Sequence, residues 1–589
     1  MAAVGATILV VPLVVYLKVV PLDNELFAFW NGQRANFDFF SFYKSRLVIG
    51  LAAVSLTGLL AGIATGQSGL RQLPMIVRLT LAGYAVMAIA STWGSPFPNV
   101  ALNGFPDRYE GLVVLLSYIA IALASFAVFT TPARVELAAK CVAVSAIGVG
   151  LIGLLQYAGV DPLRAAWGQR LILPAAYDPA TLQLQFPAEA RTIYSTLFHY
   201  NYVGSYTALV LPFVLAIVLT GATSRSTRRL AGVATVVIGL VWLLSGSRAG
   251  LTGGVLAFAV LAIGLRSRVR VRWAVVAASA AALVLMLVAA DIAAGGRIRA
   301  RAASMASDLR VLFSRTEGSV PPLPIEIVRI DPAAIHLKTP NGALLIRHEA
   351  SNLSIFDEER LQPLRIATQP QSNRIRIDDE RFSHFVCTLG RINGQPAFVI
   401  RQDQYVLNFL LLGSGIRLAL KTGRPLSYEK VETFGFEGRE RLGSARGYIW
   451  SRSLPLLRHT LVTGFGPDTF AMVFPQQDLT GKFRVYGTTD MLVDKVHNGV
   501  LQTALTTGVL SALLLGTFFA WYVVTSARIY FGDCETDAGR VFVVFGLACF
   551  AGVVGYLGAG LFNDSIVGVA PLAWAMVGLG LRANVEGAR

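Results

Sequence analysis

Residues 229–265, RLAGVATVVIGLVWLLSGSRAGLTGGVLAFAVLAIGL, contain two long apolar runs that are separated only by a short polar turn. A helix of roughly 20 residues, rising about 1.5 Å per residue, crosses the ~30 Å hydrocarbon core of a bilayer. Runs 229–247 and 249–265 therefore predict two membrane spans joined by a tight turn. Because the bilayer core offers no water to the backbone, each span is expected to be an α-helix.

Runs of the same kind recur along the whole chain. Of its 589 residues, 54% are hydrophobic and 15% are charged, whereas soluble domains are about 25% charged. We predict an all-α polytopic membrane protein with about 12 transmembrane helices, whose first span is retained and not cleaved as a signal peptide. The runs that qualify lie at about 3–20, 46–65, 74–93, 111–129, 140–158, 200–220, 229–247, 249–265, 273–291, 498–525, 541–562 and 565–582.

Short basic connections predict the orientation of these spans. One connection is basic at residues 225–229 and another at residues 266–272, which by the positive-inside rule places both in the cytoplasm. Alternate threading from these anchors places both termini on the same side, together with Arg71, Arg134, Lys140 and Arg528. The net charge is +16, but many of the Lys and Arg residues lie in short loops between apolar runs, as topology requires, so nucleic-acid binding is not expected.

A long extracytoplasmic segment is predicted between the ninth and tenth spans. Alternating runs such as IEIVRI (325–330) and AFVIRQ (397–402), with Asn-Gly turn signals between them, predict a small β-rich domain inserted there. The predicted divisions are a membrane domain at 1–291, a connector at 292–322, the β-rich insert at 323–405, a loop with an interfacial helix at 406–496, and a second membrane part at 497–589.

Three polar segments at predicted outer span ends are candidates for chemistry. Arg248 lies in the turn SGSRAG (245–250), Arg446 begins the run RGYIW, and His497 stands at the start of the tenth span. A guanidinium group can grip a phosphate with two hydrogen bonds, and a neutral imidazole can accept a proton near neutral pH. Each also has a structural alternative: an interfacial anchor for Arg248, amphipathic packing for the Arg446 segment, and a helix-start histidine for His497.

The sequence gives little sign of a metal or cofactor site. His336 and His348 flank an Asn-Gly turn, but a two-residue turn would place His336 opposite Arg347 and His348 opposite Ile335, on opposite faces of the hairpin. The four cysteines fall in different predicted compartments, and no HExxH, Walker or dinucleotide-binding pattern occurs. We therefore expect no disulfide, no metal and no cofactor.

The order of these segments resembles the O-antigen ligase and polymerase family. The segments are SGSRAG, the Arg-x-x-x-Trp helix, GFGPDTF (464–470) and HNGVLQTALTTGVLSALLL (497–515), with RYEG (108–111) and HYNYVGSY (199–206) upstream. The resemblance implies a fold similar to the C-type glycosyltransferases. It implies that Arg248 and Arg446 hold a donor pyrophosphate and that His497 activates the acceptor hydroxyl. Secondary candidates for glycan or phosphate contact are Arg108, Glu110, Arg191, Asp468 and Asn498.

By this resemblance, the chain would transfer a glycan from undecaprenyl pyrophosphate to a hydroxyl on a lipid, glycan or protein, without metal and with inversion. The site would face outward from the bacterial inner membrane, in contact with membrane lipid, and both termini would be cytoplasmic. Ligase, repeat-unit polymerase and protein O-oligosaccharyltransferase remain open within the family. Alternatives of other classes are a flippase for a lipid-linked glycan and an envelope sensor. The long β-rich insert lies outside the resemblance, and its role is open.

Overall fold

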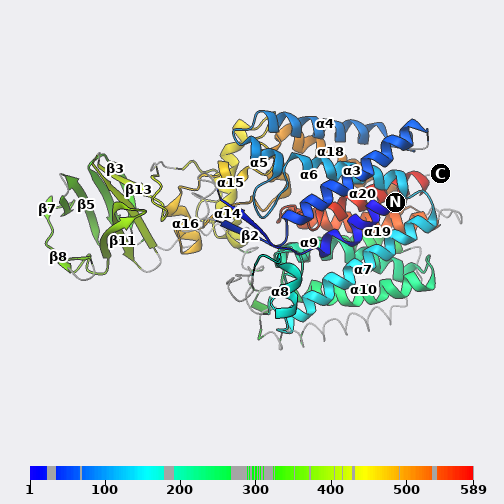
Figure 1. The fold of residues 1–589 in the computed structure, drawn as a ribbon, viewed down its shortest axis with the longest axis horizontal. Helices are drawn as coiled ribbons and strands as arrows, with labels where there is room; N and C mark the ends of the chain where they lie inside the picture. Colours follow the sequence, from blue (N-terminus) through cyan, green and yellow to red (C-terminus); the bar gives the residue numbers. More distant parts are fainter. Residues whose placement is uncertain are drawn as a thin grey trace.

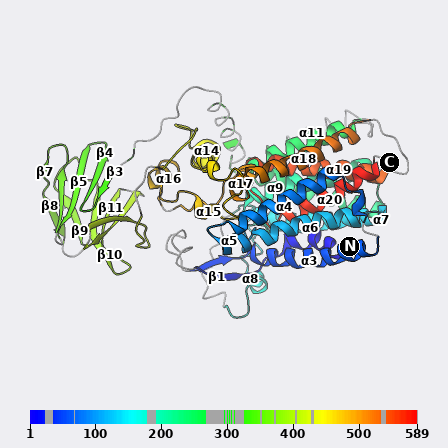
Figure 2. The same cartoon turned by 90° about the horizontal axis from the view of Figure 1, so that it is seen from above.

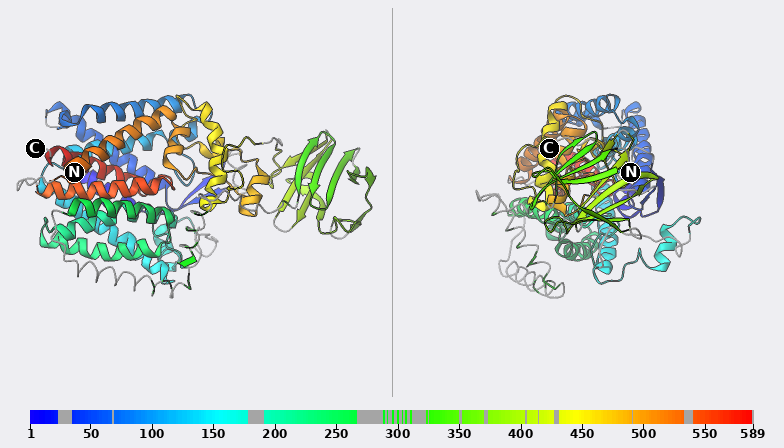
Figure 3. Two further views of the ribbon diagram at one scale, coloured as in Figure 1. Left: turned by 180° about the vertical axis from the view of Figure 1, so that it is seen from behind. Right: turned by 90° about the vertical axis from the view of Figure 1, so that its left-hand side faces the viewer.

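The computed structural model shows a helical bundle with two β-sheets beyond one of its ends (Figure 1). A layer of short helices lies between the bundle and the sheets (Figure 3). The structure describes residues 1–22, 35–66, 69–177, 191–266, 325–349, 352–369, 373–402, 405–413, 415–426, 431–489, 491–532 and 540–587, with single positions between 288 and 323.

Eight of the described helices are long and apolar enough to cross a membrane. The chain is therefore a mostly helical, polytopic membrane protein, as its hydropathy predicts. The eight are α3 (Phe42–Ala64), α4 (Met75–Trp93), α7 (Pro132–Tyr157), α9 (Tyr200–Thr220), α10 (Arg225–Leu244), α11 (Arg248–Leu265), α18 (Val509–Tyr530) and α19 (Arg540–Gly560). Two further apolar helices, α6 (Leu112–Val128) and α20 (Ala570–Gly587), pack among them.

The predicted first span is wrong in its length. The helical part of run 3–20 stops at Leu13, as α1 (Ala2–Leu9) and a 3-10 turn (Val11–Leu13). Pro12 within the turn lacks an N–H and so cannot continue the helical ladder. The chain then forms β1 (Lys18–Pro21), which pairs with β2 (Ala35–Asp38). Apolar composition alone does not distinguish one long helix from a short helix followed by a strand.

The predicted tenth span, at 498–525, is in fact two helices. A short α17 (Gly499–Thr506) precedes α18, and Gly508 breaks the run with φ of 105°. A Cβ at Gly508 would lie 2.1 Å from the carbonyl oxygen of Val462, so the chain can pass there only as glycine. Run 273–291 lies outside the described residues except at two positions, and the total of 12 spans stays a prediction.

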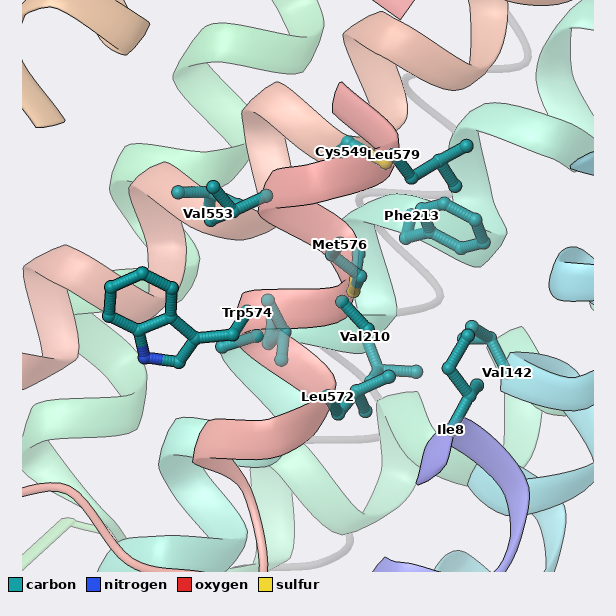
Figure 4. Packing of buried hydrophobic residues seen from close by; sticks show 14 of the residues in the cluster. Ile8, Val142, Val210, Phe213, Cys549, Val553, Leu572, Trp574, Met576 and Leu579 are labelled. Atoms are coloured by element: carbon teal, nitrogen blue, oxygen red, sulfur yellow. The ribbon is translucent and has the colours of Figure 1, made fainter. Parts of the chain in front are cut away.

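Glycines let the central helices of the bundle approach closely. α9 and α19 are buried along most of their lengths and both contact α11. A Cβ at Gly253 of α11 would lie 2.2 Å from the carbonyl oxygen of Gly555 in α19, and one at Gly250 would lie 2.5 Å from the Cα of Gly204 in α9. Small residues at such contacts are the usual means of packing helices in a membrane. Figure 4 shows Trp574 and neighbouring α20 side chains packed in the core.

The connections at the end of the bundle away from the sheets are tied together. The Arg582 guanidinium of α20 donates to the carbonyl oxygen of Phe126 (3.0 Å) and to the Gln72 side chain. Thr227 at the start of α10 likewise donates to Glu136 of α7. These are the connections that carry the short basic segments. Both chain termini also lie toward this end (Figures 1 and 3).

The described strands from 326 to 419 form two antiparallel sheets that share one apolar core (Figure 2). The five-stranded sheet has the order β3 (Glu326–Asp331), β4 (Ala334–Thr339), β5 (Gly342–Glu349), β6 (Asn352–Asp357) and β7 (Gln362–Pro363). The six-stranded sheet has the order β13 (Gly415–Ala419), β12 (Tyr405–Leu412), β11 (Gln395–Gln402), β10 (Val386–Ile392), β9 (Arg374–Ile377) and β8 (Ile366–Gln369).

Two details of the sheets differ from the sequence prediction. The strands continue to Ala419, whereas the predicted insert ends at residue 405. The prediction missed β12 because its sequence, YVLNFLLL, buries side chains on both faces of the sheet and so lacks the alternation of apolar and polar residues that marks a strand. His336 pairs with Leu345 and not with Arg347, since Thr339 already pairs with Gly342 and the turn is one residue earlier. The predicted Asn393-Gly394 turn is confirmed: both residues have positive φ and join β10 to β11.

Short helices fill the space between the bundle and the sheets. They include α14 (Leu442–Ser453), a 3-10 helix (Leu454–His459), α15 (Phe470–Val473) and α16 (Leu479–Tyr486). Three further short helical segments of the chain are α5 (Pro98–Asn103), α8 (Ala166–Ile172) and a 3-10 turn at Leu70–Gln72, of which the last lies at the opposite end of the bundle, beside Arg582. Tyr448 of α14 is fully buried in an apolar cluster with Phe470 and Val496, so this layer is packed onto the chain that precedes α17.

The glycine contact between α11 and α19 gives a stability prediction. Gly253→Ala should lower the unfolding temperature in detergent, because the added methyl overlaps a helix backbone; overpacking typically costs about 1–3 kcal/mol. Gly232→Ala in α10 is the matched control, since a Cβ there meets nothing within 4 Å. Equal unfolding temperatures for the two variants would show that the helices separate easily at Gly253.

Candidate active site at the α19–α20 connection

Residues 561–565, the first part of the connection from α19 to α20, contact four different segments of the chain. The Leu561 carbonyl accepts a hydrogen bond from Asn498 (3.0 Å), and the Asn563 side chain donates one to Ser205 of α9 (3.2 Å). The other three positions contact Arg446, His497 and Glu110. Since α19 and α20 are both embedded in the core, this connection is a fixed point for the segments that contact it.

His497 is held at two points by Asp564. Its backbone N–H donates to Oδ2 of Asp564 at 3.2 Å, and its ring Nδ1 lies 3.2 Å from the same oxygen. The backbone at His497 has φ of 56°, which is uncommon for a residue other than glycine and indicates a constrained conformation. The Asp564 side chain is 0% exposed, whereas that of His497 is 31% exposed. The imidazole is thus oriented from inside and open on its other edge.

Asp564 is ionised despite its burial. Burial works against the charged carboxylate, but His497, Arg108 and Lys495 outweigh it and hold the pKa of Asp564 below its usual value. A carboxylate close to Nδ1 stabilises the imidazolium that forms when Nε2 takes up a proton. Here Asp564 does so by its charge, because the contact with Nδ1 lacks the geometry of a hydrogen bond. Among the described residues, Nε2 of His497 has no hydrogen-bond partner. The pair can therefore act as an oriented general base.

Arg446 contacts the same connection from the α14 side. Its Nε and Nη2 donate to the carbonyl oxygen of Phe562, at 3.0 and 2.6 Å. Burial lowers the pKa of Arg446 below its usual value, Asp564 opposes that change, and the like charge of Arg248 adds to it. Arg446 therefore lies within electrostatic range of both the Asp564 carboxylate and the Arg248 guanidinium group.

Trp450 gives a physical reason for the Arg-x-x-x-Trp pattern. One helical turn after Arg446, its indole Nε1 donates to the carbonyl oxygen of Val496 at 2.9 Å. Residues four apart lie on the same face of a helix. One face of α14 thus contacts both the α19–α20 connection and the residue before His497.

Arg248 is the first residue of α11. The Ser247 side chain caps this helix by accepting a hydrogen bond from the Gly250 N–H (3.1 Å), and the Gly204–Gly250 contact fixes α11 against α9. The N-terminus of a helix favours an anion nearby. Arg248 and the start of α11 together form a positively charged corner next to Arg446.

Arg108 and Asp468 form a buried ion pair that shapes the wall of the site. Arg108 Nε lies 2.7 Å from Oδ1 of Asp468, and both side chains are almost completely buried. Oδ2 of Asp468 accepts hydrogen bonds from the backbone N–H groups of Phe105 and Glu110. Asp468, in the GFGPDTF segment, therefore folds the loop before α6. These contacts give Arg108 and Asp468 a structural role at the edge of the site.

Glu110 is the second carboxyl group near Asp564. Its Oε1 accepts hydrogen bonds from Tyr118 (2.6 Å) and Ser565 (2.7 Å). Burial raises the pKa of Glu110 to about 7, although the Arg108 charge and these hydrogen bonds oppose the rise. The site thus holds one carboxyl group whose pKa is lowered and one whose pKa is raised. Such a division is common where groups exchange protons.

Lys495 supplies further buried positive charge. Its Nζ donates to the Tyr202 hydroxyl at 2.7 Å and lies 3.5 Å from Oδ2 of Asp494. Burial favours the neutral amine, but Asp494 and Tyr202 outweigh it and raise the pKa of Lys495 above its usual value. Lys495 therefore stays charged and helps keep Asp564 ionised.

A cavity of about 300 Å³ reaches from this site into the bundle. Its polar end includes Arg108, Glu110, Asn563 and Asp564. Between the helices its walls are apolar, formed by Leu115 of α6, Leu515, Gly516 and Phe519 of α18, Leu557 of α19 and Trp574 of α20. Gly516 lines the cavity and is exposed, so the cavity opens to the surface of the bundle beside α18.

The structure brings some of the predicted site residues together and separates others. Arg446 and His497 contact the α19–α20 connection, Arg108, Glu110 and Asp468 lie beside it, and Arg248 lies within electrostatic range of Arg446. Asn498 caps α17 by accepting from the Leu501 N–H at 2.9 Å, which is a structural role. Arg191 is exposed beside Gly159 and makes no contact with these residues in the part of the chain that is described.

Sequence reasoning missed Asp564 and gave Lys495 no role. A signal for Asp564 was present, because it is the only acidic residue between Val541 and Arg582, at the junction of two apolar runs. A lone carboxylate at such a place is costly unless it has a partner. Lys495 stands two residues before His497, at the predicted end of a span, where a lysine is expected at the membrane interface without any further role.

Compared with known proteins, the chain matches no protein-family model and no curated protein by sequence. The order of the motifs and the geometry of their residues are therefore the grounds for proposing a function. In the described part of the chain, no group of three His, Cys, Asp or Glu side chains is arranged to hold a metal ion.

The His497–Asp564 contact yields a catalytic prediction. Asp564→Asn should lower kcat by about 10²-fold or more with little change in KM, because the amide cannot stabilise an imidazolium. Glu437→Gln is the matched control: it removes an exposed carboxylate that forms no ion pair with the described residues. Transfer rates measured on both purified variants check this. Equal rates for Asp564→Asn and the unmodified protein would remove Asp564 from the reaction.

Proposed function

We propose that this chain is a membrane glycosyltransferase of the O-antigen ligase kind. It moves a glycan from undecaprenyl pyrophosphate to a hydroxyl group of an acceptor. The observation that carries the proposal is the imidazole of His497, oriented by Asp564, beside the two guanidinium groups of Arg248 and Arg446. An oriented base next to paired cations suits a reaction in which a hydroxyl attacks and a pyrophosphate leaves.

The chemical step needs no further reactant. Nε2 of His497 takes the proton of the acceptor hydroxyl as its oxygen bonds to the anomeric carbon of the glycan. The bond from that carbon to the pyrophosphate oxygen breaks, and the electron pair leaves with undecaprenyl pyrophosphate. Attack from the face opposite the leaving group inverts the anomeric centre. Asp564 stabilises the imidazolium formed on the way.

The guanidinium groups act on the leaving group. Negative charge grows on the pyrophosphate as the glycosidic bond breaks, and positioned cations stabilise that charge more in the transition state than in the bound donor. Arg446 is anchored to the Phe562 carbonyl, and Arg248 starts a helix whose N-terminal N–H groups favour anions. The guanidinium group of Arg446 is therefore held in place before the donor arrives, and the start of α11 fixes the backbone of Arg248.

The cavity suits the lipid part of a substrate. Its polar end meets Asp564, and its apolar walls run between α6, α18, α19 and α20 toward the lipid-facing side. An isoprenyl or acyl chain can lie in such a groove while its polar head stays at the site. A carrier that diffuses in the bilayer would enter sideways and would not have to cross water.

The proposal includes a position in the cell envelope. The basic connections and both chain ends lie at one end of the bundle and the site at the other. By the positive-inside rule, the site and the two sheets would be extracytoplasmic in a bacterial inner membrane, and both termini cytoplasmic. About 12 spans and a β-rich insert between the ninth and tenth complete this topology.

Three enzymes of this kind differ only in the acceptor to which they transfer the glycan. A ligase, a repeat-unit polymerase and a protein O-oligosaccharyltransferase would share the His497 and arginine geometry and differ in the hydroxyl that they use. A flippase for a lipid-linked glycan is the alternative of another class. It would move the carrier without breaking the glycosidic bond, so chemical analysis of the product distinguishes it from a transferase.

Reconstitution tests the proposal directly. Purified protein in liposomes, given an undecaprenyl-pyrophosphate glycan and candidate hydroxyl acceptors, should release undecaprenyl pyrophosphate and form an inverted glycoside. His497→Ala should abolish the product while leaving expression and membrane insertion intact, and EDTA should change the rate little. A His497→Ala protein with substantial activity, or strong inhibition by EDTA, would contradict the mechanism.

Filling the cavity tests its role in lipid binding. A Cβ at Gly516 meets nothing within 4 Å, so Gly516→Phe should fold and place a ring at the mouth of the cavity. We expect a higher KM for the lipid-linked substrate. Gly58→Phe is the matched control, because Gly58 is also an exposed glycine within a span with open space at its Cβ. Identical KM values for the two variants would separate the cavity from substrate binding.

A further inference from the structure

The outer face of the six-stranded sheet carries exposed arginines in a regular arrangement. In β9, Ile375 and Ile377 point into the core between the sheets, so Arg374 and Arg376 point outward. The same alternation places Arg401 of β11 outward, next to the buried Ile400. Arg417 of β13 points outward between two buried residues. These four residues, Arg374, Arg376, Arg401 and Arg417, are called the arginine face below.

The strand register places three of these arginines close together. Thr388 of β10 stands opposite Arg374 on one side and Val399 on the other, and Val386 stands opposite Arg401. Strands in a sheet lie about 4.8 Å apart, so Arg374, Arg376 and Arg401 surround a patch about 10 Å wide. Thr388 and Asn408 add hydroxyl and amide groups to the same face, by the alternation of β10 and β12.

No acidic side chain in the described structure forms an ion pair with the arginine face. The acidic residues next to β9 in the sequence are Asp378, which is exposed at the end of the strand, and Asp379, which lies 2.9 Å from Arg381. Two of the arginines share β9, and one strand separates them from Arg401 of β11. Like charges at this spacing repel one another through solvent. Four exposed, unpaired guanidinium groups on one flat face are therefore a cost to the fold, which a bound anion would remove.

The five-stranded sheet has the opposite charge balance. Residues 325–363 contain 4 Lys or Arg and 6 Asp or Glu, whereas residues 364–426 contain 9 Lys or Arg and 4 Asp or Glu. On the five-stranded sheet the charges pair locally, as His336 does with Asp331 at 3.0 Å. The positive charge therefore belongs to one face and is not a general property of these sheets.

We propose that the arginine face binds an anionic glycan chain, one that carries carboxylate or phosphate groups along its length. This inference rests on the proposed function, and it assigns the two sheets a role in holding the glycan of the donor or acceptor. A guanidinium group binds a carboxylate or phosphate with two hydrogen bonds, and Thr388 and Asn408 offer partners for sugar hydroxyls. The exposed part of this face, around the arginines of β9 and β11, suits an extended polymer, whereas Ala397, Leu410 and Ala419 are buried elsewhere on the same face.

The position of the sheets favours a glycan over a membrane surface. The α14–α16 layer lies between the sheets and the helical bundle (Figures 1 and 3). The sheets therefore lie beyond the ends of the spans, along the direction in which the spans run. A glycan chain attached to a carrier at the site extends away from the bilayer in this direction, whereas lipid headgroups stay at the ends of the spans.

Binding of a model polyanion tests the proposal. The full chain in detergent should bind polygalacturonate and not neutral dextran, and added salt should weaken binding as it screens the charges. The triple variant Arg374→Gln, Arg376→Gln, Arg401→Gln should lose at least about tenfold in affinity. The matched control is Arg329→Gln, Lys338→Gln, Arg347→Gln, which removes three exposed charges from the five-stranded sheet. It should bind like the unmodified protein.

Three outcomes would overturn the inference: no binding of polygalacturonate, equal losses in the two triple variants, or tighter binding to phosphatidylglycerol vesicles that depends on the arginine face. His497→Ala separates this inference from the proposed function, because it should still bind the polyanion. Transfer without binding would refute the arginine face alone. Binding that requires the arginine face, in a protein that transfers no glycan, would refute the transferase and leave a glycan-binding surface.

Discussion

The short connection between α19 and α20 contacts Arg446, His497 and Glu110, three residues of the candidate site. α19 is buried by α9, α11 and α20, so residues 561–565 start from a rigid base. From there they contact the starts of α9 and α17, the α14 helix and the loop before α6. Because the three proposed catalytic and binding residues come from distant parts of the sequence, a fixed central connection is what allows them to share one site.

Charge balance is the second constraint on this end of the bundle. Asp468 and Asp564 are buried carboxylates, and Arg108 and Lys495 are buried cations placed among them. Removing one of these four charged side chains would leave a buried charge without a partner, and the loss of stability would exceed the stabilisation that the ion pair itself provides. The network keeps Asp564 ionised while Glu110 has a pKa of about 7. Asp564, which precedes Ser565, and Glu110, which accepts a hydrogen bond from Ser565, therefore favour different protonation states.

The sequence predicts most of the bundle but not the pairing within the site. Long apolar runs mark the spans because a bilayer leaves the backbone no alternative. The same signal fails at run 3–20, where a proline ends the helix early, and at run 498–525, where a close contact requires a break at Gly508. Motif order identified Arg248, Arg446 and His497 as candidates. Asp564 was missed because its significance comes from a neighbour 67 positions away in the chain, which only the fold reveals.

The central claim is that Arg248 and Arg446 grip one pyrophosphate next to His497. Binding of undecaprenyl pyrophosphate to the purified protein in nanodiscs tests it most directly, as a double-mutant cycle of Arg248→Gln and Arg446→Gln. The account predicts that each change weakens binding, that the two losses are not additive, and that His497→Ala binds the carrier normally. Additive losses, or carrier binding that neither arginine affects, would contradict a shared pyrophosphate site.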